Sequence, residues 1–389
     1  MLMSRYAGLT SPFAIATVWF EKLRVLAIPR VVVTGGPCAG KTSAMVALVA
    51  WAVSRGYIPL IVPEAATILI TAGLDPRSPE FQEAVLDHVI TMDMIFLRQA
   101  ELLIAQGKKP LLIHDRGLFD QLAYMSEADF RALAKSRGIE PTRVRDEWYT
   151  DVIFMRSAAC GAEEFYDLAS NAARYETLEE ARALDERTLH AWVGRTSLRQ
   201  IDNVRGQSFA DKINRVVASV ARALGEPEPV DAERAYRVRN FVSDKLPAHS
   251  VAIDIVQTYL VNNTGDHERV RARGQHNVWS YTHTIKQEVS SGVTITRERI
   301  IDRRDYDDFL VRRDPVRLTL FKTRHCFVHA GHYCELDVYE HECAGEIHLQ
   351  IKVPLEQMTG DLSLPPFLDI EREITHDPAF TNRALTLRK

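Results

Sequence analysis

The chain is short of cysteine, of long apolar runs and of positive charge, and each shortage excludes a class of protein. Its five cysteines, spread over 389 residues, form neither a CxxC pair nor a zinc-ligand spacing. The sequence therefore predicts a reducing, cytoplasmic environment and not a disulfide-stabilised secreted fold. No apolar run approaches the ~18 residues that a membrane-spanning helix needs, although peripheral membrane association is left open. The formal net charge of −4 argues against a bulk attraction to nucleic acid, while a local basic site is compatible with it.

The stretch from residue 30 to about 224 alternates short apolar runs with longer helical segments. A continuous β-branched run between two helices is typical of a strand buried on both faces of a parallel sheet. Ser78 and Pro79 are suited to begin a long helix over 79–106, and Gly107 follows its end. We therefore expect a doubly wound parallel α/β domain. Its predicted strands are residues 30–34, 59–62, 110–114, 152–155 and 198–201.

The pattern of apolar and polar residues changes after an acidic, Pro-rich stretch near residue 230. Strand-like segments follow with turn residues between them, and one helix candidate, 304–311, interrupts the series. Seven or more antiparallel strands with one or two helices predict an α+β domain built on a barrel or a strongly curled sheet. The predicted organisation is an N-terminal extension (1–29), a first domain (30–225), a linker (226–232) and a second domain (233–389).

A Gly-x4-Gly-Lys-Thr motif occupies residues 35–42, between the first predicted strand and an Ala-rich helix. Glycines let the backbone curl so that successive N–H groups point at an anion, and the helix N-terminus adds its positive dipole end. Lys41 is expected to reach the β- and γ-phosphates, and the Thr42 hydroxyl to ligate Mg²⁺. The motif predicts an ATP or GTP site with Mg²⁺, and no Asn-Lys-x-Asp motif specifies guanine. The predicted binding loop is Gly35, Gly36, Pro37, Cys38, Ala39, Gly40, Lys41, Thr42 and Ser43.

Three further residues complete the predicted catalytic set with Lys41. Asp115 ends the third strand, where an acid can hold Mg²⁺ or take a proton from an attacking hydroxyl. Glu64 ends the second strand, placed to meet a second substrate, and either acid could instead cap a helix. Arg174 lies in a segment, 171–177, that we expect to form a mobile lid with 158–166. It would neutralise charge on the transferred phosphoryl group, although a surface ion pair is the alternative.

These segments, with 161–166 and 201–203, resemble the P-loop family grouped around nicotinamide-riboside kinase. They are especially similar to the branch typified by the TRPL translocation defect protein. The resemblance covers roughly residues 30–224 and implies a kinase-like fold and nucleotide binding. GTP and phospholipid binding are associated with that branch.

The second domain carries basic residues at two-residue spacing on several predicted strands. Side chains two apart share a face of a strand, so these charges would gather on one surface. Such a concentration costs self-repulsion unless an anion neutralises it, which predicts a phosphate site; a solvated sheet face is the alternative. The predicted ligands are Arg269, Arg271, Lys286, Arg297, Lys322 and Arg324.

The second domain resembles the CYTH, or triphosphate-tunnel, family. The segments that carry the resemblance are 255–260, 269–271, 285–286, 322–324, 335–339 and 373–385. The resemblance implies a closed tunnel in which Lys and Arg bind triphosphate while glutamates hold Mg²⁺ or Mn²⁺ for hydrolysis. Several acid positions depart from this pattern. In the register we expect, the first strand presents Tyr236, Val238 and Asn240, a later one presents Arg297, Arg299 and Ile301, and a third presents Gln350 and Lys352. Only Glu335, Asp337 and Glu373 remain, which predicts ligand binding without metal-dependent hydrolysis.

The function predicted from the sequence is a Mg²⁺-dependent, ATP- or GTP-binding P-loop kinase or NTPase. Its cationic second domain would bind a phosphorylated small molecule or a phospholipid head group and not cleave it. The alternative is a nucleotide-switched regulatory protein, with little turnover, that binds a phospholipid or phosphoinositide. Nucleic acid is an unlikely partner given the acidic net charge.

Overall fold

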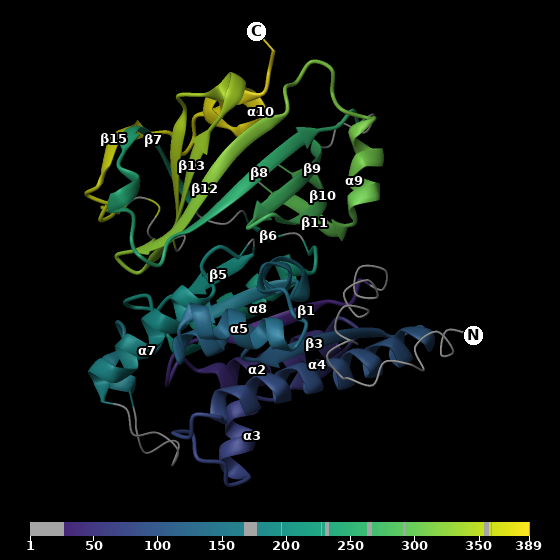
Figure 1. Ribbon diagram of the computed structural model, residues 1–389, viewed down its shortest axis with the longest axis vertical. Coiled ribbons are helices and arrows are strands. Elements are labelled where there is room, and N and C mark those ends of the chain that lie inside the picture. Colours follow the sequence, from purple (N-terminus) through teal and green to yellow (C-terminus); the bar gives the residue numbers. More distant parts are fainter. Residues whose placement is uncertain are drawn as a thin grey trace. The chain divides into compact units, whose positions relative to one another are not determined.

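The computed structural model divides into two compact units, Met1–Trp192 with Ser197–Val220 and Val193–Thr196 with Ala221–Lys389 (Figure 1). The first unit holds the α/β half of the chain and the second holds the strand-rich half. The structure describes residues 27–166, 177–195, 197–226, 228–229, 233–262, 267–290, 293–353, 358 and 360–388.

The first unit is built on a five-stranded sheet in the order β2-β3-β1-β4-β5. Every pairing between neighbours is parallel, which confirms the predicted doubly wound α/β domain. β1 lies at the centre of the sheet, and all five of its residues are buried. The strands are β1 (Arg30–Thr34), β2 (Tyr57–Val62), β3 (Lys109–Asp115), β4 (Asp151–Met155) and β5 (Leu198–Ile201).

Helices connect these strands, as parallel pairing requires. The long helix expected over 79–106 is α4, and it contacts both β3 and β2. α2 leads directly out of the loop that follows β1. The helices of this part are α2 (Lys41–Ser54), α3 (Ala65–Thr71), α4 (Phe81–Ala105), α5 (Glu127–Ser136), α6 (Pro141–Arg143), α7 (Leu178–Ala191) and α8 (Phe209–Ala223). Among the helices that the structure describes, none combines the length and the apolarity that a bilayer crossing demands.

A buried polar network ties α4 to the end of β3. Asp93 of α4 accepts a hydrogen bond from Trp148 Nε1 at 2.5 Å and lies 2.9 Å from His114 Nε2. Buried polar groups are costly unless they are paired, so this network fixes how α4 lies on the sheet. His114 immediately precedes Asp115, and the network thus helps to fix the carboxyl end of β3.

The second unit is a ten-stranded sheet in the order β15-β7-β14-β13-β12-β8-β9-β10-β11-β6. The pairings that the structure describes are all antiparallel, which confirms the predicted antiparallel α+β domain. The strands are β6 (Glu228–Pro229), β7 (Glu233–Phe241), β8 (Val251–Tyr259), β9 (His267–Gln275), β10 (Val278–Ser290), β11 (Val293–Ile301), β12 (Leu320–His329), β13 (His332–Tyr339), β14 (Ile347–Lys352) and β15 (Leu368–Glu373).

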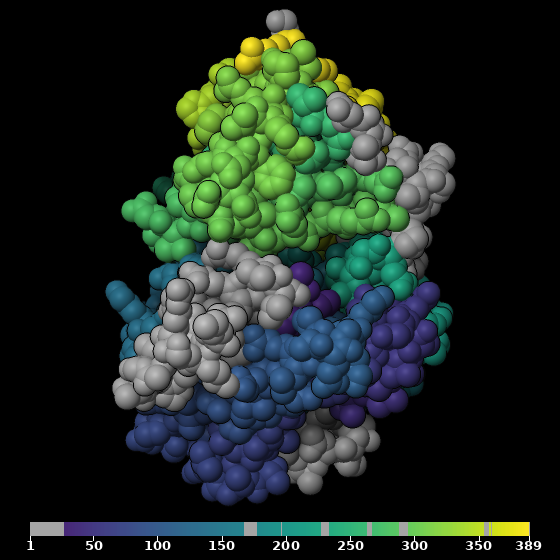
Figure 2. All heavy atoms as spheres, turned by 90° about the vertical axis from the view of Figure 1, so that its right-hand side faces the viewer, coloured from purple at the N-terminus to yellow at the C-terminus, as the bar shows by residue number. Residues whose placement is uncertain are grey.

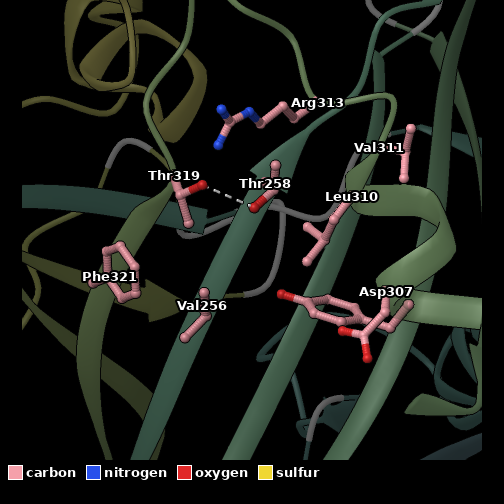
Figure 3. Close-up of a pocket in the computed structure, with 9 residues that line it drawn as sticks. Val256, Thr258, Asp307, Leu310, Val311, Arg313, Thr319 and Phe321 are labelled. Carbon is pink, nitrogen blue, oxygen red and sulfur yellow. Dashed lines mark hydrogen bonds between the residues drawn. The ribbon is translucent and has the colours of Figure 1, made fainter. Parts of the chain in front are cut away.

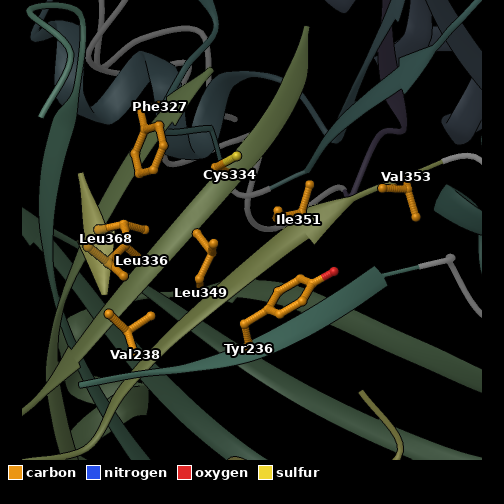
Figure 4. Close-up of a cluster of buried hydrophobic side chains, with 9 residues drawn as sticks. All are labelled: Tyr236, Val238, Phe327, Cys334, Leu336, Leu349, Ile351, Val353 and Leu368. Atoms are coloured by element: carbon orange, nitrogen blue, oxygen red, sulfur yellow. The ribbon is translucent and has the colours of Figure 1, made fainter. Parts of the chain in front are cut away.

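One face of this sheet is apolar. Leu336, Leu349 and Tyr236 are paired across β13, β14 and β7 and so form a continuous row. Residues that pack around this row complete a buried cluster (Figure 4). Its members are Tyr236, Val238, Phe327, Cys334, Leu336, Leu349, Ile351, Val353 and Leu368.

A helix covers the apolar face over β9, β10 and β11. This helix, α9 (Arg303–Leu310), matches the helix expected at 304–311. Its Tyr306 packs in a second buried cluster with Leu260, Val270, Ala272 and Ile301. In the space-filling view, α9 and its neighbouring segments make much of the green face turned to the viewer (Figure 2).

We predict that Leu349→Ala lowers the free energy of unfolding by about 3 kcal/mol, because it leaves a cavity in the apolar face. Leu349 is fully buried, whereas Leu387 is 49% exposed, so Leu387→Ala is the matched control with a small effect. Urea denaturation of the full chain measures both. Equal losses for the two variants would contradict this assignment of the core.

Candidate functional site

The loop between β1 and α2 curls in a way that needs glycine. Gly35 and Gly40 have φ angles of 142° and 90°, and Cys38 is also in the left-handed region at 55°. A Cβ on Gly35 would collide with the Met155 carbonyl, and one on Gly40 would meet the Phe209 ring. The two glycines of the motif are therefore required both by conformation and by space.

The curl leaves a run of backbone donors open. In the part of the chain that the structure describes, the N–H groups of Ala39, Gly40, Lys41 and Thr42 have no hydrogen-bond partner. The first helical hydrogen bond of α2 runs from Ala44 N to Gly40 O at 3.0 Å. Unpaired N–H groups at a helix N-terminus form a ready anion site.

Lys41 holds a positive charge over this loop. Its Nζ donates to Gly35 O at 3.2 Å and to Gly36 O at 3.4 Å. Burial and the Arg116 guanidinium lower the pKa of Lys41 to about 8, against the opposing effect of nearby acids that include Glu64 and Asp115. An anion bound in the loop would stabilise the protonated form.

The structure brings Glu64, Asp115 and Lys41 together at the carboxyl ends of β2, β3 and β1. Between them lies Arg116, whose Nε is 2.5 Å from Glu64 Oε1. Although burial alone would raise it, the charges of Arg116 and Lys41 lower the pKa of Glu64 to about 2. Glu64 occupies the N-cap position of α3, yet its side chain makes no capping bond and instead accepts from Thr67 Oγ1 at 2.7 Å.

Asp115 is the acid of the cluster with unused capacity. Its Oδ1 is buried and has no hydrogen-bond partner among the described residues. Burial and the neighbouring Glu64 and Asp120 raise the pKa of Asp115, against the opposing charges of Lys41 and Arg116. A buried, unpartnered carboxylate oxygen invites a proton or a cation.

The residues fit a magnesium ion. Thr42 is the second residue of α2 and is exposed, and Asp115 supplies the unpartnered oxygen. Oxygen donors from one carboxylate and one hydroxyl, completed by water and phosphate, are what Mg²⁺ takes. Thr42 and Asp115 are therefore the residues that would hold it.

Sequence reasoning missed the residues that support the loop from below. Lys212 of α8 donates to Ala39 O at 3.1 Å, and Ser157 Oγ donates to Pro37 O. Asp185 of α7 accepts from Gly36 N at 2.9 Å and pairs with Arg156. These side chains lie more than 100 residues from the motif, and no local pattern signals them.

The predicted lid, 158–166 with 171–177, is described only in part. Arg174 and nearly all of 171–177 lie outside the described residues. Residues 158–166 are described, and they include a short helical turn, Glu163–Phe165. Arg182 of α7 holds this segment through Ala159 O at 2.6 Å and Glu163 at 2.9 Å.

In the second unit, the predicted basic residues gather on one face of the sheet, which we call the cationic face. It is defined by Arg269 and Arg271 of β9, Lys286 of β10, and Lys322 and Arg324 of β12. The registers link these strands: Arg271 pairs with Gln257, whose other neighbour is Leu320, and side chains two apart share a face.

The predicted placement of Arg297 on the cationic face is wrong. It pairs with Ile285, which in turn pairs with Glu268, so it lies on the opposite face from Arg269 and Arg271. The residue of β11 on the cationic face is Glu298, which accepts from Thr284 Oγ1 at 2.7 Å. A one-residue shift in register separates the expected arrangement from the observed one.

The expected register of β7 is also wrong, for the same reason. Tyr236 and Val238 belong to the apolar cluster, so Glu233, Ala235 and Arg237 lie on the cationic face. Glu233 accepts from Gln350 Nε2 at 2.7 Å. The face therefore carries more acid than the sequence indicated, with Glu298 and Glu233 joining Glu335 and Asp337.

Two of these four acids, Asp337 and Glu335, are ion-paired. Asp337 accepts from Lys322 Nζ at 2.6 Å and from Arg324 Nε at 2.7 Å. Glu335 pairs with Arg324 and lies 3.8 Å from Lys352 Nζ. Although burial opposes it, Arg324 and the paired lysines hold the pKa of Asp337 and of Glu335 below their usual values.

Arg271 and Arg269 lack such compensation. Among the described residues, Arg271 contacts no carboxylate, and its partner is Gln257 Oε1 at 3.3 and 3.4 Å. Burial and the neighbouring Arg269 lower the pKa of Arg271. Arg269 Nε is buried with no partner in the described part of the structure. An uncompensated buried charge is costly, so this end of the face has capacity for an anion.

A shallow pocket of about 560 Å³ lies elsewhere, against α9 (Figure 3). Val256 and Thr258, which line it, alternate with Gln257 along β8 and so belong to the opposite face. Thr258 and Thr319 share a hydrogen bond of 3.1 Å in this pocket. The pocket and the cationic face are therefore separate.

A family model described as AAA domain matches residues 30–206, and the expected P-loop nucleotide-binding domain is confirmed there. No curated protein matches the chain.

Solved structures resemble the C-terminal region. The inorganic triphosphatase NE1496 is 22% identical, with 41% of this chain and 99% of that chain covered and a TM-score of 0.32. PH1819 from Pyrococcus horikoshii OT3 is 16% identical, with 33% and 82% covered and a TM-score of 0.25. HpAC1 from Hippeastrum, described with a dominant triphosphatase activity, is 14% identical, with 33% and 81% covered and a TM-score of 0.24.

We predict that affinity for ATP is constant below pH 8 and falls above it. The pKa of Lys41 is about 8, so at higher pH the free protein must gain a proton on binding, which costs up to about tenfold in affinity per pH unit. Isothermal titration calorimetry from pH 6.5 to 9.5 measures this decline. Lys41→Arg should remove it because a guanidinium stays charged, while Lys212, also with a pKa near 8, is common to both proteins. Parallel profiles would refute the role of Lys41.

Proposed function

We propose that the first unit is a Mg²⁺-dependent P-loop phosphotransferase or NTPase that uses ATP or GTP. The observation that carries the proposal is the run of four unpaired N–H groups from Ala39 to Thr42, with the Lys41 ammonium and the Asp115 carboxylate beside it. Preorganised donors and a cation around a terminal phosphate stabilise the charge that develops during its transfer. The resemblance to the nicotinamide-riboside kinase family supports the kinase form of this proposal.

The two carboxylates divide the work. Glu64 is held ionised by Arg116, and a pKa of about 2 makes it a poor proton acceptor, so its role is to orient Arg116. Asp115, with its unpartnered oxygen, would either take the proton of an acceptor hydroxyl or water or, with Thr42, hold the Mg²⁺ that neutralises charge on the phosphates.

We propose that the second unit binds a phosphorylated ligand at the cationic face without hydrolysing it. Arg271 and Arg269 supply uncompensated charge for such a ligand. The acids Asp337 and Glu335 are already bonded to Lys322, Arg324 and Lys352, so a divalent cation would have to displace these partners. We also propose domains at 30–225 and 233–389 with 226–232 between them. Within that stretch, Glu228–Pro229 already pairs with β11 of the second sheet, and the compact units divide at Ala221.

ATP or GTP should raise the Tm of the full chain by several degrees, and Lys41→Ala should abolish this shift. Asp115→Asn should keep the shift but lower turnover, measured as phosphate release or transfer, by about 10²-fold or more. Asp75, an exposed acid of the same unit, gives the control variant Asp75→Asn. A wild-type protein that ignores both nucleotides would overturn the proposal. Slow turnover with nucleotide-dependent capture by phosphatidic acid vesicles would favour a switch instead.

For the second unit, Arg271→Gln in a Lys41→Ala background should weaken tripolyphosphate binding by about tenfold or more, because it removes an unneutralised charge. The same variant should not lower Tm, since it also removes an uncompensated, partly buried ion. Arg297→Gln, on the opposite face, is the control. Calorimetry and thermal unfolding measure both effects, and equal responses of the two variants would contradict the assignment. Rapid release of orthophosphate with Mg²⁺ or Mn²⁺ would contradict the non-hydrolytic reading.

A further inference from the structure

A buried carboxylate lies directly beneath the phosphate-binding loop. Asp185 of α7 has no exposed surface. Its Oδ1 accepts from Gly36 N and from Ser157 N, each at 2.9 Å, and its Oδ2 lies 3.0 Å from Arg156 Nη1. A Cβ on Gly36 would collide with this side chain, so the loop and the carboxylate are in direct contact.

One peptide plane connects Asp185 to Lys41. The N–H of Gly36 and the C=O of Gly35 belong to the same trans peptide unit, so they point in opposite directions. Because the N–H is bonded to Asp185, the C=O is turned the other way, and it accepts from Lys41 Nζ at 3.2 Å. The orientation of this single unit thus sets an anchor point for the ammonium group.

The negative charge of Asp185 does not stand uncompensated near an anion site. Arg156 pairs with it directly. Lys212, whose Nζ donates to Arg156 O at 2.6 Å and to Ala39 O at 3.1 Å, adds a second cation. Arg156 also pairs with Glu186 at 2.8 Å and lies 3.5 Å from Asp202, so three acids share these cations. The direct contact of Asp185 with the loop is its hydrogen bond from Gly36 N.

We propose that Asp185 is a positioning residue that sets the place of the Lys41 ammonium by fixing the Gly35–Gly36 peptide. The proposal rests on the proposed nucleotide-binding function and adds a residue that touches no phosphate itself. Without Asp185, this peptide is free to rotate and Lys41 loses a defined acceptor.

The test compares Asp185 with a matched buried acid of the same unit. Asp151 is the first residue of β4, whereas the phosphate-binding loop lies past the last. It accepts hydrogen bonds from a backbone N–H, Val152 N at 2.8 Å, and from an arginine, Arg199 Nε at 2.6 Å. Asp185→Ala should weaken ATP binding by about tenfold or more, as misplacement of a charged group does. Asp151→Ala should leave the affinity unchanged, although both variants lose Tm. Calorimetry and thermal unfolding of the full chain give these values.

Asp185→Asn separates geometry from folding. Its amide oxygen can still accept from Gly36 N and Ser157 N, so it should recover much of the affinity that Asp185→Ala loses. If Asp185→Ala does not fold, Asp185→Ser, whose shorter side chain withdraws the acceptor from Gly36 N, is compared with Asp151→Ser. Equal affinities for the Asp185 and Asp151 variants would overturn the positioning role while wild-type binding stands. Absence of binding by the wild-type protein would instead refute the proposed function.

Discussion

The candidate chemistry of this chain depends on keeping backbone N–H groups unpaired at one turn. Such groups are ordinarily bonded in helices and strands, because an unsatisfied donor costs free energy. In the loop after β1, the carbonyls of Pro37 and Ala39 are satisfied by Ser157 and Lys212 from below. Within the described residues, the N–H groups of Ala39 to Thr42 stay unpaired in the same loop. The hydrogen bonds from Ser157 and Lys212 hold the curled backbone in place, so its conformation does not depend on a bound anion.

The site next to this loop separates two carboxylates by their surroundings. Glu64 and Asp115 end neighbouring strands and both lie near Lys41, and Arg116 pairs with Glu64 and with Asp120. The pKa of Glu64 is lowered to about 2 and that of Asp115 is raised. One guanidinium thus assigns a permanent charge to one acid and leaves the other able to exchange a proton, a division typical of catalytic pairs.

Much of the fold could be predicted because it rests on local patterns. The β-branched runs gave the parallel strands, and the Gly-x4-Gly-Lys-Thr spacing gave the loop and its lysine. The residues beneath the loop could not be predicted in this way. Asp185 and Lys212 reach it only through tertiary packing of α7 and α8, and neither lies in a motif.

The sequence also leaves open which face of a strand each side chain occupies. In β7 and β11, polar and apolar residues do not alternate strictly, so both registers were compatible with the sequence. Arg297 was placed on the wrong face, and Glu233 and Glu298 were overlooked. Contacts between strands decide such cases, because a shift of one residue exchanges every side chain between faces.

The alternation along β12, β13 and β14 separates two kinds of evolutionary change. Leu336 and Leu349 hold the apolar cluster, while their immediate neighbours Asp337 and Gln350 lie among the charges. Odd and even positions of one strand are therefore subject to different constraints, one set to packing and the other to charge. The ligand preference of this sheet can drift through one set of positions while the other set preserves the fold.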